Sequence, residues 1–205
     1  MMTNIITPIS QETINKGFTY SEFSTKVETL LAEGRTTDGN SSESMLEYTK
    51  LNIQRTNRWD KRAVLGDELV ETLATLDKKQ TWVVLTEGWC GDSAQILPFI
   101  NKMAELSDSV ELRIILREEH PEIMDLFLTD GKSRSIPKLI ILDTETLEVL
   151  GDWGPRPGVV HSSYLAERKD ENVGGKIATQ NLHLWYARDK GKETQDEINT
   201  MLKSI

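Results

Sequence analysis

The sequence predicts an α/β protein: a three-layer α/β/α sandwich with a central mixed sheet and helical additions at both ends. Short apolar runs rich in β-forming residues alternate with segments whose apolar residues recur at helical spacing. The order along the chain is helix, strand, helix, strand, helix, hairpin, helix. This order is typical of a parallel crossover followed by an antiparallel hairpin, with helices on both faces of the sheet.

Composition narrows the classes of protein that the chain can belong to. It has 205 residues and 38% hydrophobic content, enough for one core with additions. No apolar run approaches the roughly 20 residues that span a bilayer, and residues 1–11 lack the basic and apolar regions of a secretory signal. We therefore expect a cytoplasmic protein. The net charge of −9 argues against nucleic acid or an anionic membrane as a partner.

Residues 1–65 are expected to form an N-terminal helical extension. A first helical stripe ends at Gly34, and a second helix begins near Ser42 or Ser44. The apolar residues of the two helices are Phe23, Val27, Leu30 and Leu31, followed by Met45, Leu46, Tyr48, Leu51 and Ile53. A third stripe, which leads into the first strand, consists of Leu69, Val70, Leu73 and Leu76.

Residues 66–155 are expected to form the core. Strands are predicted at 81–86 and 111–116, a short helix at 122–128, and a hairpin from strands 139–142 and 147–150. Residues 156–205 are expected to form a C-terminal helical region packed on this core. In that region a helix is predicted at 159–170, Gly174-Gly175 is interpreted as a break, and a final amphipathic helix contains Ile198, Met201, Leu202 and Ile205.

The chemistry of the chain centres on Cys90, its only cysteine, in the run Trp89-Cys90-Gly91-Asp92-Ser93. Cys90 falls between a strand and the first turn of a helix, where unpaired N–H groups and the helix dipole favour the thiolate. The negative charges of Asp92 and Glu87 act in the opposite direction. A Ser93 hydroxyl in this turn can donate a hydrogen bond to the sulfur. One cysteine excludes an internal disulfide, so the thiol is expected to be reduced.

This turn resembles the active site of the thioredoxin superfamily, in which a tryptophan precedes a Cys-x-x-Cys that opens a helix. Pro98 stands where that family has the proline of its active-site helix, and the run Arg134–Lys138 looks like its cis-proline loop. A hairpin and then Gly151 follow, as in the family. The resemblance covers roughly residues 66 to 155 and is specific by combination. It is strongest to bacterial thioredoxin-like proteins with a helical N-terminal extension.

Two departures from the family pattern indicate a monothiol protein. Ser93 replaces the second cysteine, and Val84 replaces the buried aspartate that helps move protons there. The resemblance implies a cis peptide at Ile136–Pro137, facing Cys90. Backbone groups of Ile136 would pair with an extended peptide. Substrate contacts are expected from Trp89, Gly91, Asp92, Ile136, Pro137 and Gly151, and catalysis from Cys90 and Ser93.

Several neighbouring residues admit two interpretations. Glu87 is either a proton acceptor or a charge that flanks a helix start. Arg134, Lys138 and Arg156 are either solvated charges or a site for the carboxylate of a small thiol such as glutathione. His120, His161 and His183 lack ligand spacing and offer no evident base beside Cys90, so neither a metal site nor a Cys–His hydrolase is expected. No cofactor is expected.

Three functions remain open from sequence alone. In the first, Cys90 is the nucleophile of a monothiol redox protein that forms mixed disulfides with a protein or a low-molecular-weight thiol, resolved by an external thiol. In the second, the scaffold is a non-redox module that binds peptides or proteins. In the third, the Cys-Gly-x-Ser motif bridges an iron–sulfur cluster, as in monothiol glutaredoxins. The Ser135-Ile136 pair before Pro137 departs from the Thr-Val of that last family.

Overall fold

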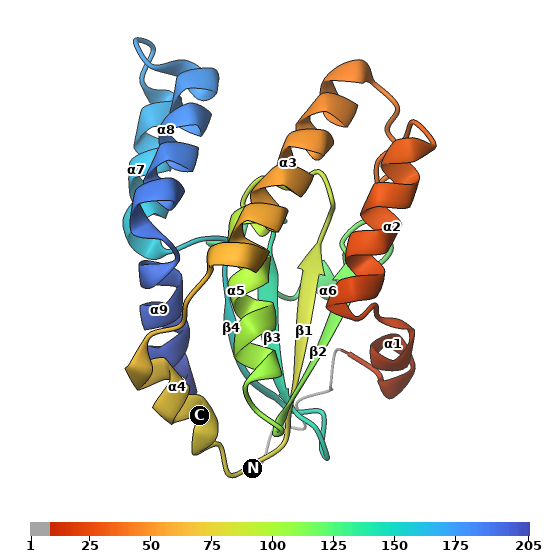
Figure 1. Ribbon diagram of the computed structural model, residues 1–205, viewed down its shortest axis with the longest axis vertical. Helices are drawn as coiled ribbons and strands as arrows, with labels where there is room; N and C mark the ends of the chain where they lie inside the picture. Colours follow the sequence, from red (N-terminus) through yellow and green to blue (C-terminus); the bar gives the residue numbers. More distant parts are fainter. Residues whose placement is uncertain (1–8) are drawn as a thin grey trace.

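The sheet of the protein has four strands in the order β2-β1-β3-β4, as seen in the computed structural model, which describes residues 9–205. The strands are β1 (Gln80–Thr86), β2 (Val110–Leu116), β3 (Lys138–Asp143) and β4 (Val149–Trp153). β2 runs parallel to β1, whereas β3 is antiparallel to both β1 and β4. Helices cover both faces (Figure 1), which confirms the predicted α/β fold class.

Side chains of β1 alternate between two hydrophobic clusters, one on each face of the sheet. Trp82 and Val84 pack into the larger cluster, and Val83 and Leu85 into the smaller. This alternation follows from the two-residue period of a strand. All seven residues of β1 are buried, as expected for a central strand covered on both faces.

The larger cluster lies under helices from both ends of the chain. The helices from the N-terminal half of the chain that cover this cluster are α2 (Tyr20–Ala32), α3 (Glu43–Arg62), α4 (Asp67–Ala74) and the central α5 (Ser93–Glu105). The covering helices from the C-terminal part are α7 (Gly158–Lys169), α8 (Gly174–Asp189) and α9 (Lys192–Leu202). The smaller cluster is covered by the short helices α1 (Gln11–Lys16) and α6 (Pro121–Met124). In Figure 1, α3 and α8 stand on either side of the upper end of α5.

Three predicted elements were wrong in extent or character. The pair Gly174-Gly175 does not interrupt a helix but begins α8, with Gly174 in the left-handed region at φ +70°. The predicted helix 122–128 is one turn long and ends at Met124. The second hairpin strand is shifted toward the C-terminus, to 149–153, because Leu147 takes a left-handed turn conformation at φ 60° and β3 and β4 pair through a register shift.

The buried face of α3 also differs from the predicted apolar stripe. Leu51 is 42% exposed, whereas Thr49, Asn52 and Trp59 are buried. The reason is tertiary: α3 packs on α5 and on the turn before it, where polar side chains find hydrogen-bond partners. Among the described residues, no helix is both long enough and apolar enough to span a membrane.

Candidate functional site

Cys90 lies in the loop between β1 and α5, with 7% of its surface exposed. Its thiol donates a hydrogen bond to the carbonyl oxygen of Ile136, at 3.3 Å from Sγ. The backbone N–H of Ser93 donates a hydrogen bond to the same sulfur, at 3.5 Å. The Ile136–Pro137 peptide is cis. The structure thus brings Cys90, Ser93, Ile136 and Pro137 into one cluster.

Burial controls the ionisation of Cys90. The pKa of the Cys90 thiol is raised to about 11, with desolvation by burial as the largest cause and the negative charge of Asp92 as the second. Hydrogen bonds from Ser93 act in the opposite direction but are outweighed. Desolvation is therefore a larger effect than either the helix N-terminus or the nearby carboxylates, the two influences that the sequence indicates.

Ser93 occupies the position of the second cysteine and is itself buried. Its Oγ accepts a hydrogen bond from Thr86 Oγ1 at 2.5 Å, which leaves the Ser93 proton available to the sulfur. Thr86 is the last residue of β1 and was missed by the sequence analysis. A buried polar residue at the end of a central strand, next to the cysteine motif, is the signal that could have identified it.

Asp92 anchors the C-terminal part of the chain to the turn that contains Cys90. Arg156, after β4, donates from Nε to Oδ1 at 3.1 Å and from Nη2 to Oδ2 at 2.5 Å. Tyr186 of α8 donates from its hydroxyl to Oδ1 at 2.7 Å. Arg156 is therefore neither a solvated charge nor an available site for a substrate carboxylate, because its guanidinium is buried against Asp92.

Gly91 is covered by side chains from both extensions. A Cβ at this position would lie 2.3 Å from Tyr48 Oη of α3 and 3.0 Å from His183 Cε1 of α8. These two side chains are hydrogen-bonded to each other, Oη to Nε2, at 3.2 Å. The Nδ1 atom of His183 lies 3.2 Å from Nε2 of Gln95 in α5. Only glycine accommodates this close approach.

No histidine base was expected beside Cys90, and the structure places His183 against Gly91 of the cysteine motif. The pKa of His183 is lowered to about 4, mainly by burial and in addition by the positive charge of Arg55. The ring is therefore neutral at pH 7, and both its nitrogens face protein groups. Its separation from Cys90 along the chain hid this contact from the sequence.

The remaining predicted contact residues are divided between the site and the sheet. Trp89 is half-buried beside Cys90, with the Arg117 guanidinium 5.0 Å from the centre of its ring. Gly151 lies within β4 opposite Ile141, where a Cβ would be 3.1 Å from Met201 Sδ of α9. The glycine that approaches the cis-proline loop is instead Gly154, at φ +124°. This correction follows from the shift of β4 toward the C-terminus.

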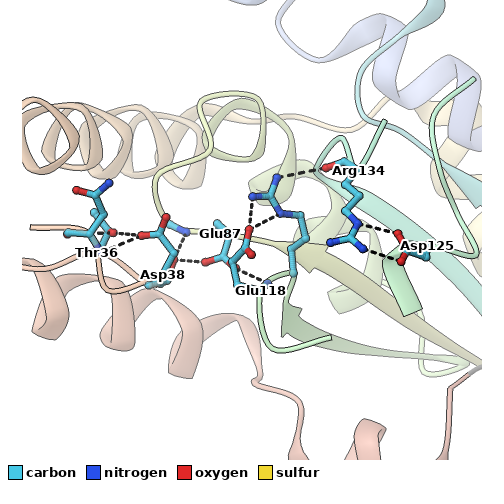
Figure 2. Close-up of polar contacts among 10 residues, drawn as sticks. Thr36, Asp38, Glu87, Glu118, Asp125 and Arg134 are labelled. Atoms are coloured by element: carbon cyan, nitrogen blue, oxygen red, sulfur yellow. Dashed lines mark hydrogen bonds and ion pairs between the residues drawn. The ribbon is translucent and has the colours of Figure 1, made fainter. Parts of the chain in front are cut away.

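Glu87 holds together three loops at the end of the sheet. Its carboxylate accepts a hydrogen bond from the hydroxyl of Thr37, before α3, and another from the N–H of Glu118, after β2, at 3.0 Å. Figure 2 shows Glu87 between these two loops. Burial raises the pKa of Glu87. Glu87 is thus a buried anchor, not an exposed charge that flanks a helix.

The other two candidate anion-binding cations also have partners within the chain. Arg134 forms two hydrogen bonds with Asp125, at 2.7 and 2.6 Å, as drawn in Figure 2. Lys138 is paired with Asp152 at 2.8 Å. Within residues 9–205, no group of three or more His, Cys, Asp or Glu side chains is arranged to hold a metal ion.

Comparisons with known proteins agree with this architecture. A structure of a protein of unknown function from Pseudomonas aeruginosa is similar at a TM-score of 0.55 and 18% identity, over 91% of this chain and 98% of that one. An HIV epitope scaffold is similar at a TM-score of 0.54 and 18% identity, over 87% of this chain and 98% of that one. No protein of curated function matches. A thioredoxin family model matches residues 39–170, and the chain therefore belongs to the thioredoxin family.

Proposed function

We propose that this protein is a monothiol exchange protein in which Cys90 forms and releases mixed disulfides. The observation that supports it most directly is the position of Cys90 Sγ, 3.3 Å from the carbonyl oxygen before the cis-proline of a thioredoxin fold. The protein keeps the thiol, the loop that faces it and a buried Ser93 that donates a hydrogen bond to the sulfur.

The exchange proceeds in two balanced steps. The Cys90 thiolate attacks one sulfur of an external disulfide, a new S–S bond forms, and the second sulfur leaves as a thiolate. Because Ser93 has no sulfur, an external thiol must then attack the mixed disulfide and release Cys90. The partners in this proposal are a protein or a low-molecular-weight thiol, in a reducing compartment such as the cytoplasm. Neither nucleic acid nor a membrane is among the proposed partners.

The small fraction of Cys90 that is ionised limits the rate of this exchange while the thiol is buried. A pKa of about 11 leaves roughly one thiol in ten thousand ionised at pH 7. A disulfide that enters the site and moves the thiol off the carbonyl of Ile136 removes the hydrogen bond that favours the protonated form. Ser93 then supplies hydrogen bonds to the thiolate that forms. Ser93 is therefore proposed as the group that stabilises the reactive sulfur.

The alternative is a non-redox binding module on the thioredoxin scaffold. The raised pKa of Cys90 favours this alternative, because a protonated and sheltered thiol is a slow nucleophile. In this function the surface around the cis-proline loop binds a partner without covalent exchange.

The pH dependence of Cys90 alkylation by iodoacetamide, in parallel with mixed-disulfide formation measured by intact mass, separates the two functions. No other cysteine contributes to the signal. Cys90→Ser is the blank for both measurements. Monothiol exchange predicts a mixed disulfide that forms in the native protein and is released by added thiol, even with a high alkylation midpoint. A native protein that takes up no disulfide, while the denatured chain does, supports the binding module.

A further inference from the structure

A cavity of about 80 Å³ reaches Cys90 from the side of the N-terminal extension. It lies between α2, α3 and the first turns of α5, and Cys90, Ser93 and Ala94 line its inner end. Its volume exceeds the ~10–15 Å³ that a single water requires. The cavity therefore has room for the end of a small organic molecule next to the sulfur.

Side chains of the protein itself cover the residues that follow Cys90. Tyr48 and His183 cover Gly91, and Arg156 and Tyr186 cover Asp92. The sulfur rests against the carbonyl of Ile136. Because only 7% of the Cys90 surface is exposed, a small reagent has to use the cavity or wait for these contacts to open.

The residues that line the cavity discriminate between ligands by the sign of the ligand's charge. Its ionisable carboxyl groups are Glu28 and Asp60 near the exposed end and the buried Glu87 within. Among the described residues that line it, none is Lys, Arg or His. Phe23 and Val27 supply apolar surface beside these carboxyl groups. This combination accepts neutral or cationic groups with a short apolar part and repels anions.

We infer that this cavity is the docking site for the low-molecular-weight thiol or disulfide that exchanges with Cys90, and that this compound is small and neutral or cationic. The inference rests on the proposed monothiol exchange and names the substrate class of that site. It disfavours glutathione, whose carboxylates would face Glu28 and Asp60. In the first step the Cys90 thiolate attacks one sulfur of the disulfide form, the S–S bond of the compound breaks, and its second sulfur leaves as a thiolate. In the second step the thiol form attacks the mixed disulfide as a thiolate, and Cys90 leaves as the thiolate.

Three methanethiosulfonates that differ only in the transferred group test the inference: aminoethyl (cationic), methyl (neutral) and sulfonatoethyl (anionic). Each converts the Cys90 thiol to a mixed disulfide and releases methanesulfinate and a proton, so one mass change reports one event. The labelling rate of Cys90 with each reagent is divided by the rate of the same reagent with a free thiol in an unstructured peptide, which corrects for differences in intrinsic reactivity. We expect the corrected anionic rate to be roughly tenfold below the cationic rate, as repulsion by the acidic lining implies.

Pairs of variants, one inside and one outside the lining, test whether reagents reach Cys90 through the cavity. Ser24→Trp places a bulky side chain on the half-buried wall of the cavity, whereas Thr25→Trp lies on the same helix but outside the lining. We expect Ser24→Trp to slow labelling by the neutral reagent at least fivefold, roughly 1 kcal/mol, and Thr25→Trp to leave it unchanged. Glu28→Lys should raise the anionic rate relative to the neutral rate. Glu47→Lys, on the exposed surface of α3, is the matched control.

The outcomes distinguish the inference from the proposed function. If the labelling rate depends neither on the charge of the reagent nor on the substitutions Ser24→Trp and Glu28→Lys, reagents reach the sulfur by another route. This result would overturn the inference about the cavity and leave the proposed monothiol exchange intact. Native protein that no reagent labels, while the denatured chain reacts, overturns both. Circular dichroism confirms that each variant is folded, and Glu28→Lys at the exposed end provides the test if Ser24→Trp fails to fold.

Discussion

Arg156 holds Asp92 through two hydrogen bonds, and this buried ion pair attaches the C-terminal extension to the turn that contains Cys90. Tyr186 completes the attachment from α8. Asp92 is thus connected to the loop after β4 and to a helix near the C-terminus. The N-terminal extension reaches the same turn through Tyr48, which contacts Gly91. Both extensions therefore cover the turn that contains Cys90, in addition to enlarging the core.

Removal of Arg156 is expected to destabilise the protein strongly. Arg156→Met leaves the buried Asp92 carboxylate without its ion-pair partner, and we expect a loss of about 3–5 kcal/mol in the free energy of unfolding, measured in urea. The double variant Asp92→Asn/Arg156→Met should recover part of this loss, since no unpaired charge remains. Arg134→Met, which breaks an exposed pair with Asp125, should lower the free energy of unfolding far less than Arg156→Met does. An equal loss in both single variants would contradict the importance of burial.

Neutralisation of Asp92 is expected to make Cys90 more reactive. The carboxylate raises the pKa of the thiol, so Asp92→Asn should lower the midpoint of its alkylation below that of the unmodified protein. Burial remains, and the midpoint should therefore stay above the ordinary value for cysteine. Asp108→Asn, far from the turn along the chain and not among the causes of the shift, serves as a control. A midpoint unaffected by Asp92→Asn would show that desolvation alone sets the pKa.

Glu87 should give stability an unusual dependence on pH. Because burial raises the pKa of Glu87 in the folded state, its contribution to stability is greatest below the unfolded pKa and is lost as pH rises through the folded pKa. Glu87→Gln removes this titration while an amide can still bond with Thr37 and Glu118. The unmodified protein should therefore gain stability relative to Glu87→Gln as the pH falls from about 7 to about 4.

The matched truncation of Glu87 separates its charge from its hydrogen bonds. Glu87→Ala leaves the hydroxyl of Thr37 and the N–H of Glu118 without their acceptor, and it should cost about 2–3 kcal/mol at pH 7, measured by urea unfolding. If Glu87→Ala were as stable as Glu87→Gln, the anchoring role of this side chain would be refuted.

Gly91 is expected to tolerate no larger residue without movement of the covering helices. A Cβ would lie 2.3 Å from Tyr48 Oη, so Gly91→Ala must displace Tyr48 or His183. We expect a loss of about 1–3 kcal/mol, together with faster iodoacetamide labelling of Cys90 as the cover loosens. Gly175→Ala, in the first turn of α8, should be neutral or slightly stabilising, because its Cβ would make only an ordinary contact of 3.9 Å with Arg168 Nε. Unchanged labelling in folded Gly91→Ala would mean that this cover does not limit access to Cys90.

Local pattern accounts for most of the fold. The apolar run of β1, the stripe of α5 and the residues around the cis Ile136–Pro137 peptide each depend on neighbours in sequence, and their predicted positions agree with the structure. The predictions were less accurate for elements whose ends depend on contacts with residues far away in the sequence. The shifted β4 and the helix that begins at Gly174 show this, because pairing with β3 and packing on the core decide where they begin.

Short motifs and local periodicity in the sequence are enough to place a lone cysteine after a strand and at the start of a helix. The cis-proline loop that faces this cysteine was implied by the resemblance to the thioredoxin superfamily. The surroundings of Cys90, in contrast, depend on tertiary contacts. Tyr48, Arg156, His183 and Tyr186 meet at the turn from elements far apart in the chain. Burial and paired charge, which set the reactivity of Cys90, arise from such long-range packing, and no local pattern encodes them.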